Sequence, residues 1–458
     1  MSSAKQGQTR DMTQGSALSN ILIFAIPLFI SNFFQQCYNI GDTMIASHNL
    51  GQSALAAIGL TGSITGLVIG FANGINSGYG ILLARAFGSK NEEQMKSVVA
   101  WTLILNVAIS VLITVATLLF AEPVLRLIQT PEDVFSESRT YLTVVMAGMA
   151  TALFYNMGSG LLRAVGNSKI PLYFLIFCCF CNIFLDLLLV MVFHMGVLGV
   201  ALGTLISQAL SSVLILRNLM RTKDIYRLEL RKIRLHAAPL SMLLKIGLPS
   251  GLQSTMYNIA NMVIQTALNS FGTDTMAAWT AFGKVDSFYW MISSAFGVAI
   301  TTFVGQNYGA GKIDRMKKSV RVCFCMDLAT ALTLSALMYL FLGKFLLSLF
   351  TTDAEVLSIG VRIMQIIVPA YAPFVFIEIF SGALRGAGNV LIPMLLTCGG
   401  ICVTRILWIF FFVPSHRAVE TIIFSYPGSW VLTATLFILY FAYYTRRHWG
   451  RSATRDLK

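Results

Sequence analysis

Long segments almost free of charged residues recur along the whole chain. Residues 101–120 and 172–193 are two examples, and each is long enough to cross a bilayer as a helix. Only 12% of the residues are charged and 56% are hydrophobic, whereas soluble chains carry about 25% charged residues. The sequence therefore predicts an all-α membrane protein.

We predict twelve transmembrane helices in two six-helix lobes. Their expected ranges are 21–45, 54–83, 97–120, 136–160, 170–193, 197–216, 245–270, 277–305, 319–343, 358–384, 391–413 and 421–444. Residues 1–20 are polar, and no short apolar run ends at a small-residue cleavage site. We therefore expect this segment to be a retained tail and not a signal peptide.

The distribution of Lys and Arg predicts the orientation, because basic loops stay cytoplasmic. Of the 33 basic residues, 26 lie in the termini and in the loops on their side, five in the opposite loops and two within spans. We therefore expect a multi-pass protein of the cell (inner) membrane with both termini in the cytoplasm. The net charge of +13 follows from this bias and from attraction to lipid headgroups, and no motif indicates a nucleic-acid partner.

The second half of the chain repeats the first. Pro27 recurs as Pro249, and residues 162–167 (Leu-Arg-Ala-Val-Gly-Asn) recur as 384–389 (Leu-Arg-Gly-Ala-Gly-Asn), both at an offset of 222. Two halves that start on the same side of the membrane form a parallel repeat around a central cavity. The predicted domains are a tail (1–20), an N-terminal lobe (21–216), a basic linker (217–244), a C-terminal lobe (245–444) and a second cytoplasmic tail (445–458).

Acidic residues inside the first-half spans are functional candidates, because a charge is costly in the bilayer. Asp42 lies in span 21–45, and Asn182 and Asp186 are four apart on one face of span 170–193. Thr204 adds a hydroxyl from the next span. Such oxygens suit a small hard cation, and two close carboxylates cannot both ionise cheaply. These four residues are predicted to bind a sodium ion or to share a proton.

The second half carries four charged residues within its spans: Lys284, Asp286, Glu378 and Arg405. Lys284 and Asp286 are two apart on a helix and cannot face each other, so each is expected to pair elsewhere. Two interpretations stay open, a structural ion-pair network or a second proton or substrate site. Asp327 is expected to reach the membrane surface near the cytoplasmic end of its helix.

Prolines and aromatic residues suggest a hinge and a cavity wall. Pro27 and Pro249 lie within spans and bend them, either as fixed kinks or as hinges. Aromatic, Met and amide side chains on the same two helices suit apolar cations, although such residues also face lipid or neighbouring helices. The candidate cavity residues are Phe33, Phe34, Gln35, Tyr38, Gln253, Met256, Tyr257 and Asn261.

Several of these elements resemble the multidrug and toxic compound extrusion (MATE) family, within the multidrug/oligosaccharidyl-lipid/polysaccharide flippase superfamily. The matching residues are 26–27 (Ile-Pro), 248–249 (Leu-Pro), 305–311 (Gly-Gln-Asn-Tyr-Gly-Ala-Gly), 160–167 with its copy, and 182–186 (Asn-Ile-Phe-Leu-Asp). The resemblance runs from about residue 16 to 445. It implies a twelve-helix, two-lobe antiporter that exchanges organic substrates for sodium ions or protons.

The resemblance also bears on the site. MATE proteins with acids in the N-terminal lobe carry Asp, Asn-x-x-x-Asp and Thr at the positions of Asp42, Asn182, Asp186 and Thr204. Another branch carries an acid where this chain has Tyr257, so the C-terminal cation site of that branch is not expected here. The resemblance also favours the hinge interpretation for Pro27.

The predicted function is export of drug-like, cationic organic compounds by alternating access, driven by sodium ions or protons. The expected partners are the bilayer and small organic substrates, with no cofactor beyond the coupling ion, in a monomer. One alternative is a lipid-linked glycan flippase, which needs a strongly cationic cavity. Another is a membrane-embedded enzyme, but the sequence has no HExxH, GxSxG or Walker motif. We therefore do not expect an enzyme.

Overall fold

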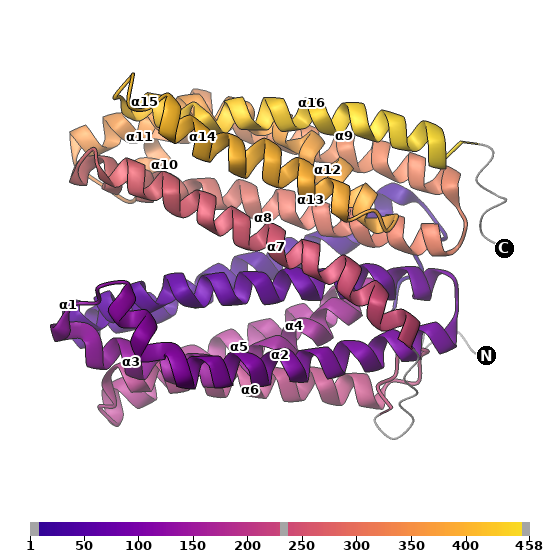
Figure 1. Ribbon diagram of the computed structural model, residues 1–458, viewed down its shortest axis with the longest axis horizontal. Helices are drawn as coiled ribbons and strands as arrows, with labels where there is room; N and C mark the ends of the chain where they lie inside the picture. Colours follow the sequence, from indigo (N-terminus) through magenta and orange to yellow (C-terminus); the bar gives the residue numbers. More distant parts are fainter. Residues whose placement is uncertain (1–8, 230–236, 451–458) are drawn as a thin grey trace. The chain divides into compact units, whose positions relative to one another are not determined.

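The computed structural model describes residues 9–229 and 237–450, apart from the side chains of 43, 46–55, 63 and 237–239. The ends of both predicted tails and the middle of the predicted linker therefore lie outside the described residues. The described part is helical, and no strand occurs in it. Figure 1 shows long helices lying alongside one another within each half of the chain.

The chain divides into two compact units. Unit 1 comprises residues 1–11 and 26–251, and unit 2 comprises residues 12–25 and 252–458. One boundary follows residue 11, and the other two fall inside helices α1 and α7, within two residues of Pro27 and Pro249. Each unit is described by itself, and the predicted lobe boundaries stay a prediction.

Unit 1 contains most of α1 and the helices up to the first part of α7. The bounds are α1 Ala17–Gly88, α2 Glu92–Leu127, α3 Glu132–Ala147, α4 Met149–Ala164, α5 Lys169–Leu187, π-helical η1 Leu188–Val192, α6 Gly196–Arg221 and α7 Ala237–Asn269. Helix α6 packs against α3, α4 and α5. These contacts bring the polar faces of α5 and α6 together.

Unit 2 contains the remaining helices, several of which are interrupted by tighter or wider turns. The bounds are α8 Thr273–Gly309, α9 Ile313–Leu337, η3 Met338–Leu342, α10 Gly343–Ser348, α11 Ala354–Ile367, η4 Val368–Ala370, α12 Tyr371–Gly386, α13 Leu391–Thr397, η5 Cys398–Val403, α14 Thr404–Phe411, α15 Val419–Ile423 and α16 Ser425–His448. Helix α8 packs against α9, α11 and α12. The 3₁₀ turn η4 contains Pro369, and it separates α11 from α12 because proline cannot continue the helical hydrogen bonding.

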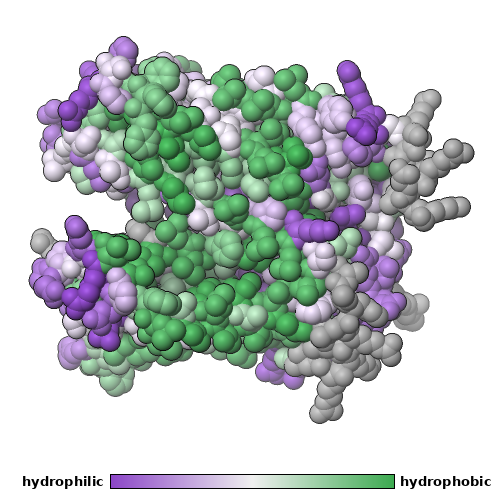
Figure 2. All heavy atoms as spheres, in the orientation of Figure 1, coloured by the Kyte–Doolittle hydropathy of each residue, from purple (hydrophilic) through white to green (hydrophobic). Residues whose placement is uncertain are grey.

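The described helices account for the twelve predicted spans. Ten helical segments are long and apolar enough to cross a membrane, and two of these lie within α1. The bent pair α3 and α4 makes an eleventh span when the two helices are counted as one. Helix α7 is the remaining segment, and it is long but carries Gln253, Asn258, Asn261 and Gln265. On the face shown in Figure 2, hydrophobic residues cover the middle of the helices and hydrophilic residues gather towards their ends.

Both copies of the repeated motif end a helix in the same way. Gly166 and Gly388 adopt φ values of 82° and 86°, which favour glycine. The following Asn167 and Asn389 donate their backbone N–H groups to Leu162 and Leu384, at 2.8 and 3.0 Å. These bonds satisfy carbonyls at the ends of α4 and α12. The sequence repeat is therefore also a structural repeat.

Candidate cation-coupling site

The predicted pair on α5 lies in the interior of unit 1. Asn182 and Asp186 are both 0% exposed, and the Asn182 Nδ2 donates to Asp186 Oδ1 at 3.3 Å. Gly203 on α6 faces this carboxylate so closely that a Cβ there would clash with Asp186 Oδ1. The i, i+4 spacing on α5 and the absence of a side chain on α6 together hold Asp186 in place.

Two further helices bring in Asp42 and Thr204. The Thr204 Oγ1 on α6 donates to Asp42 Oδ2 on α1 at 3.4 Å. Asp42 also interacts directly with Asp186 and Asn182. The structure therefore brings together all four residues that were singled out for this site, from three helices of one unit.

Several oxygens of this cluster have no hydrogen-bond donor. Asp42 Oδ1, Asn182 Oδ1 and Asp186 Oδ2 are buried and unpartnered. Buried polar atoms are normally satisfied, so these three unpartnered acceptors fit a small cation or a shared proton. The described residues contain no group of three or more His, Cys, Asp or Glu that could hold a metal ion.

Neighbouring hydroxyl groups complete the surroundings of the two acids. Tyr38, which the sequence assigned to the cavity wall, is buried beside Asp42, Thr204 and Ser207. Tyr141 on α3 interacts with both acids. The i, i+4 spacing of Tyr38 and Asp42 is a local signal that could have identified Tyr38, whereas Tyr141 has no such signal.

The other candidate cavity residues are divided between the units. Phe33, Phe34 and Gln35 lie on α1 in unit 1, and Phe33 is exposed with its ring 6.0 Å from that of Phe34. The second set lies on α7 in unit 2 and comprises Gln253, Met256, Tyr257 and Asn261. A cavity shared by the two sets stays a prediction.

The predicted hinge prolines lie inside helices. Pro27 interrupts the hydrogen bonding of α1, and Ser31 Oγ donates to the Pro27 carbonyl at 2.8 Å. Pro249 lies in the part of α7 that belongs to unit 1. Whether either helix bends during function stays a prediction.

The four second-half charges do not form an ion-pair network in the described part of the chain. Asp286 instead accepts hydrogen bonds from Trp290 Nε1, at 2.6 Å, and from the Tyr371 hydroxyl. Arg405 is buried and donates to Ser429 Oγ at 3.0 Å. Aromatic and hydroxyl groups therefore satisfy both side chains.

An aromatic cluster surrounds Arg405. Its guanidinium carbon lies 3.8 Å from the Tyr426 ring centroid and 5.5 Å from that of Trp430, in the range of cation–π attraction. Trp290 contacts Trp430 as well, with centroids 5.9 Å apart. Sequence reasoning missed these rings, although Trp290 lies four residues after Asp286. Lys284 is exposed on α8.

The expectation for Asp327 was wrong. Asp327 is 1% exposed, and both of its carboxylate oxygens are buried without a hydrogen-bond partner. Helix α9 begins at Ile313, so Asp327 lies about 20 Å along it, and its carboxylate does not reach the surface of the protein. Its charge interacts with Glu378 on α12 and with Tyr289 on α8. Glu378 packs against Gly297, where a Cβ would clash with its Oε1.

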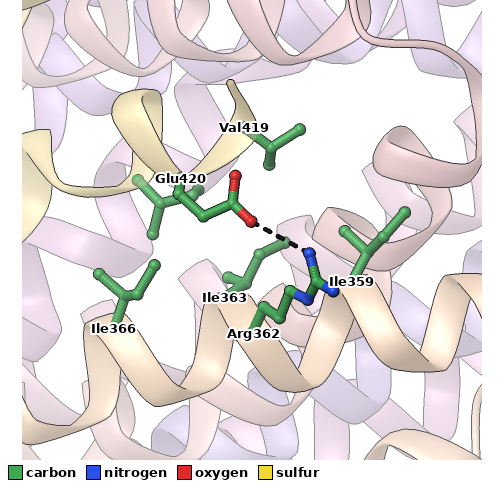
Figure 3. Close-up of a pocket in the computed structure, with 7 residues that line it drawn as sticks. Ile359, Arg362, Ile363, Ile366, Val419 and Glu420 are labelled. Atoms are coloured by element: carbon green, nitrogen blue, oxygen red, sulfur yellow. Dashed lines mark hydrogen bonds and ion pairs between the residues drawn. The ribbon is translucent and has the colours of Figure 1, made fainter. Parts of the chain in front are cut away.

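A pocket between α11 and α15 is too small to hold a drug-like molecule. Its volume is about 170 Å³, whereas ligand sites have about 300–1,000 Å³. Figure 3 shows aliphatic side chains around an ion pair, in which Arg362 lies 3.4 Å from Glu420. This pair links two helices and does not form a substrate site.

Comparison with known proteins identifies the family. The family model described as MatE matches residues 27–188 and again residues 249–411. The chain belongs to the MATE family. The two matches begin at Pro27 and Pro249, so the MATE model follows the internal repeat. The chain is thus a multi-pass membrane transporter and not an enzyme.

Individual MATE proteins match over almost the full chain. The probable multidrug resistance protein YoeA of Bacillus subtilis is 29% identical over 443 residues, which cover 95% of each chain. The multidrug export protein MepA of Staphylococcus aureus (strain MSSA476) is 21% identical and covers 88% of this chain and 92% of its own length. A solved outward-facing multidrug resistance MATE transporter superposes with a TM-score of 0.90 at 22% identity, covering 98% of this chain and 100% of that one. This structural likeness confirms the fold of twelve transmembrane helices.

Proposed function

We propose that this MATE protein exports drug-like organic cations across the cell membrane in exchange for sodium ions or protons that bind at Asp42 and Asp186. The observation that carries the proposal is the carboxylate pair in unit 1, in which Asp42 Oδ1 and Asp186 Oδ2 are buried and unpartnered. The names of the relatives, which refer to multidrug resistance and multidrug export, support the substrate class.

The physical basis of coupling is a site whose charge changes when it is emptied. Two neighbouring carboxylates without a counter-charge repel each other in a low dielectric. One bound cation or proton removes most of this repulsion, so the occupied and empty sites favour different local structures. Each pH unit of gradient supplies about 1.4 kcal/mol per proton, and each 100 mV supplies about 2.3 kcal/mol per net charge.

The residues of the site have distinct roles in this proposal. Asp42 and Asp186 carry the charge that the ion neutralises. The Asn182 and Thr204 side chains orient the two carboxylates through the hydrogen bonds at 3.3 and 3.4 Å. Gly203 leaves the space that Asp186 occupies. A sodium ion would be held by oxygens of these side chains, whereas a proton would be shared between the two acids.

Of the two interpretations of the second-half charges, a second proton site in unit 2 remains. Glu378 and Asp327 interact, and neither oxygen of Asp327 has a partner. We propose that this pair takes up a proton in addition to the ion bound in unit 1. Asp286 and Arg405 already have hydrogen-bond partners, so we assign them a structural role.

The flippase alternative has less support. It requires free basic charge for a pyrophosphate group, but Arg405 is buried against Tyr426 and bonded to Ser429. Of the two basic residues that lie within the second-half spans, only Lys284 is exposed. A single exposed lysine is a weak site for a group with several negative charges.

Transport into proteoliposomes tests the proposed function. Flux of a fluorescent organic cation is measured for the wild type, Asp186→Asn and the control Asp274→Asn. A sodium gradient and a pH gradient are imposed in separate experiments. Asp274 lies in the first turn of α8 and outside the site. We expect one gradient to drive flux in the wild type and the control, and Asp186→Asn to reduce it at least tenfold. Undiminished flux in Asp186→Asn would contradict the assignment.

A further inference from the structure

Unit 2 contains a second, larger pocket that lies apart from the acidic residues discussed above. It has a volume of about 520 Å³ and is formed by α9, α12 and α16 with the residues that follow α16. The lining residues with aromatic rings or positive charge are Lys317, Arg321, Phe324, Phe376, Phe380, Phe441, Arg446 and Trp449. Val320, Thr445 and Gly450 complete the described lining, which contains no acidic residue.

Aromatic rings form one continuous wall of this pocket. The Phe324 and Phe376 ring centroids are 4.7 Å apart, and Phe380 stacks on Phe441 at 4.3 Å. Phe441 contacts Trp449 edge to face at 5.6 Å. All four phenylalanines are only partly buried. The wall therefore offers an apolar surface that a hydrocarbon chain could cover.

The positive charges lie at one end of the pocket. Lys317 and Arg321 belong to the first turns of α9, and Arg446 belongs to the last turn of α16. Phe324 lies seven residues after Lys317, and therefore about 10 Å further along α9. The pocket thus changes from cationic at the helix ends to aromatic towards the middle of the helices. On the predicted orientation, the cationic end faces the cytoplasmic leaflet.

Trp449 provides an independent indication of a polar ligand. Its side chain is 1% exposed, and its indole N–H is buried without an acceptor in the described residues. Buried N–H groups of tryptophan usually have a partner. A ligand with a negatively charged oxygen next to the three cations would supply one.

We propose that this pocket binds an anionic phospholipid, with its phosphate near Lys317, Arg446 and the Trp449 N–H and one acyl chain along the phenylalanine wall. Charge complementarity selects an anion, and the apolar wall selects an anion that carries a hydrocarbon chain. The cations also exclude the organic cations that we propose as substrates. This binding site is independent of the coupling site in unit 1 and requires no transport activity.

Native mass spectrometry of the full-length protein in detergent tests this site. The protein is titrated with phosphatidylglycerol, and the double variant Lys317→Gln/Arg446→Gln is compared with Lys318→Gln/Arg447→Gln. The control loses the same charge from the neighbouring positions of α9 and α16, which do not line the pocket. We expect the first variant to bind the lipid about tenfold more weakly than the wild type, since each basic contact contributes, and the control to bind within twofold of the wild type. Equal weakening in both variants would contradict a specific site.

A further variant and two further ligands define the chemistry. Trp449→Phe keeps the aromatic ring but removes the N–H, and we expect it to weaken phosphatidylglycerol binding severalfold. Phosphatidylcholine, which has no net charge, is expected to bind at least tenfold more weakly than phosphatidylglycerol. Inorganic phosphate is expected not to displace the lipid. Equal binding of both lipids, or displacement by inorganic phosphate, would overturn the proposal.

Discussion

At the scale of single residues, the coupling site depends on a glycine as much as on its acids. Gly203 of α6 faces Asp186 so closely that a methyl group would displace the carboxylate. Asp186 has no free space on that side, and its Oδ1 already accepts from Asn182. A small residue without functional groups therefore determines where the charge lies.

We predict that Gly203→Ala reduces gradient-driven flux about tenfold or more, because small displacements of functional groups have large effects on rate. The matched control is Gly66→Ala, since a Cβ at Gly66 meets no atom within 4 Å. Both variants add one methyl group to a helix of unit 1. Flux measured in proteoliposomes should fall only in Gly203→Ala. Equal flux in both variants would show that the position of Asp186 is not critical.

Asp286 is half-buried and Asp327 is buried, and these two acids of unit 2 differ in their partners. We predict that Asp286→Asn lowers the thermal unfolding midpoint by several degrees, because it weakens charge-assisted bonds of about 1.5–3 kcal/mol from Trp290 and Tyr371. Asp327→Asn should leave the midpoint unchanged or raise it at pH 8, since it removes a buried charge that has no partner. Unfolding of the detergent-purified variants measures both. A loss of stability in Asp327→Asn as large as in Asp286→Asn would contradict the assigned roles.

At the scale of helices, close backbone contacts join α1 and the first part of α7 within unit 1. A Cβ at Gly78 would lie 2.7 Å from the Gly247 Cα, and a Cβ at Gly74 would clash with the backbone of Ser250 and Gly251. Small residues four apart on both helices allow this approach, as is common in membrane helix packing. The contact holds the part of α7 that contains Pro249 against α1.

We predict that Gly78→Ala destabilises the protein by about 1–3 kcal/mol, because the methyl group meets backbone atoms that cannot move independently. Gly62→Ala is the control, since a Cβ there meets nothing within 4 Å and alanine favours the helix. In chemical or thermal unfolding, Gly78→Ala should be less stable than the wild type, and Gly62→Ala should be as stable as the wild type or more stable. The reverse order would contradict the packing described for these two helices.

Periodicity and repetition predicted the helices well, but they could not predict which neighbours cover a given side chain. The spacing of Asn182 and Asp186 places them on one face because helix geometry is local. The contact of Asp42 with Thr204 joins residues 162 apart in the chain. The side-chain chemistry and the family resemblance grouped these residues, but no local spacing predicted their contact. Asp327 was assigned to the surface from its position in the chain, whereas the packing of α8 and α12 buries it. Tyr141 and Trp449 gave no local signal for the same reason.

At the scale of the whole molecule, the repeat is the feature that sequence and structure share most clearly. The family model matches twice, and Gly166 and Gly388 adopt the same left-handed backbone conformation. The chemistry of the halves nevertheless differs. Unit 1 carries the Asp42 and Asp186 pair, whereas unit 2 carries Asp327 with Glu378 and the aromatic cluster around Arg405. We therefore propose that the two units have different roles in transport, and that the principal coupling ion binds in unit 1.

The central claim is that substrate moving one way drives the coupling ion the other way through the site in unit 1. The most direct measurement uses a substrate gradient alone, in proteoliposomes with no imposed ion gradient, and follows internal pH with a trapped dye and sodium with an isotope. We predict that outward substrate flux drives inward movement of one of the two ions, and that Asp186→Asn abolishes this ion movement. Substrate flux without movement of either ion, or ion movement that persists in Asp186→Asn, would contradict antiport through Asp42 and Asp186.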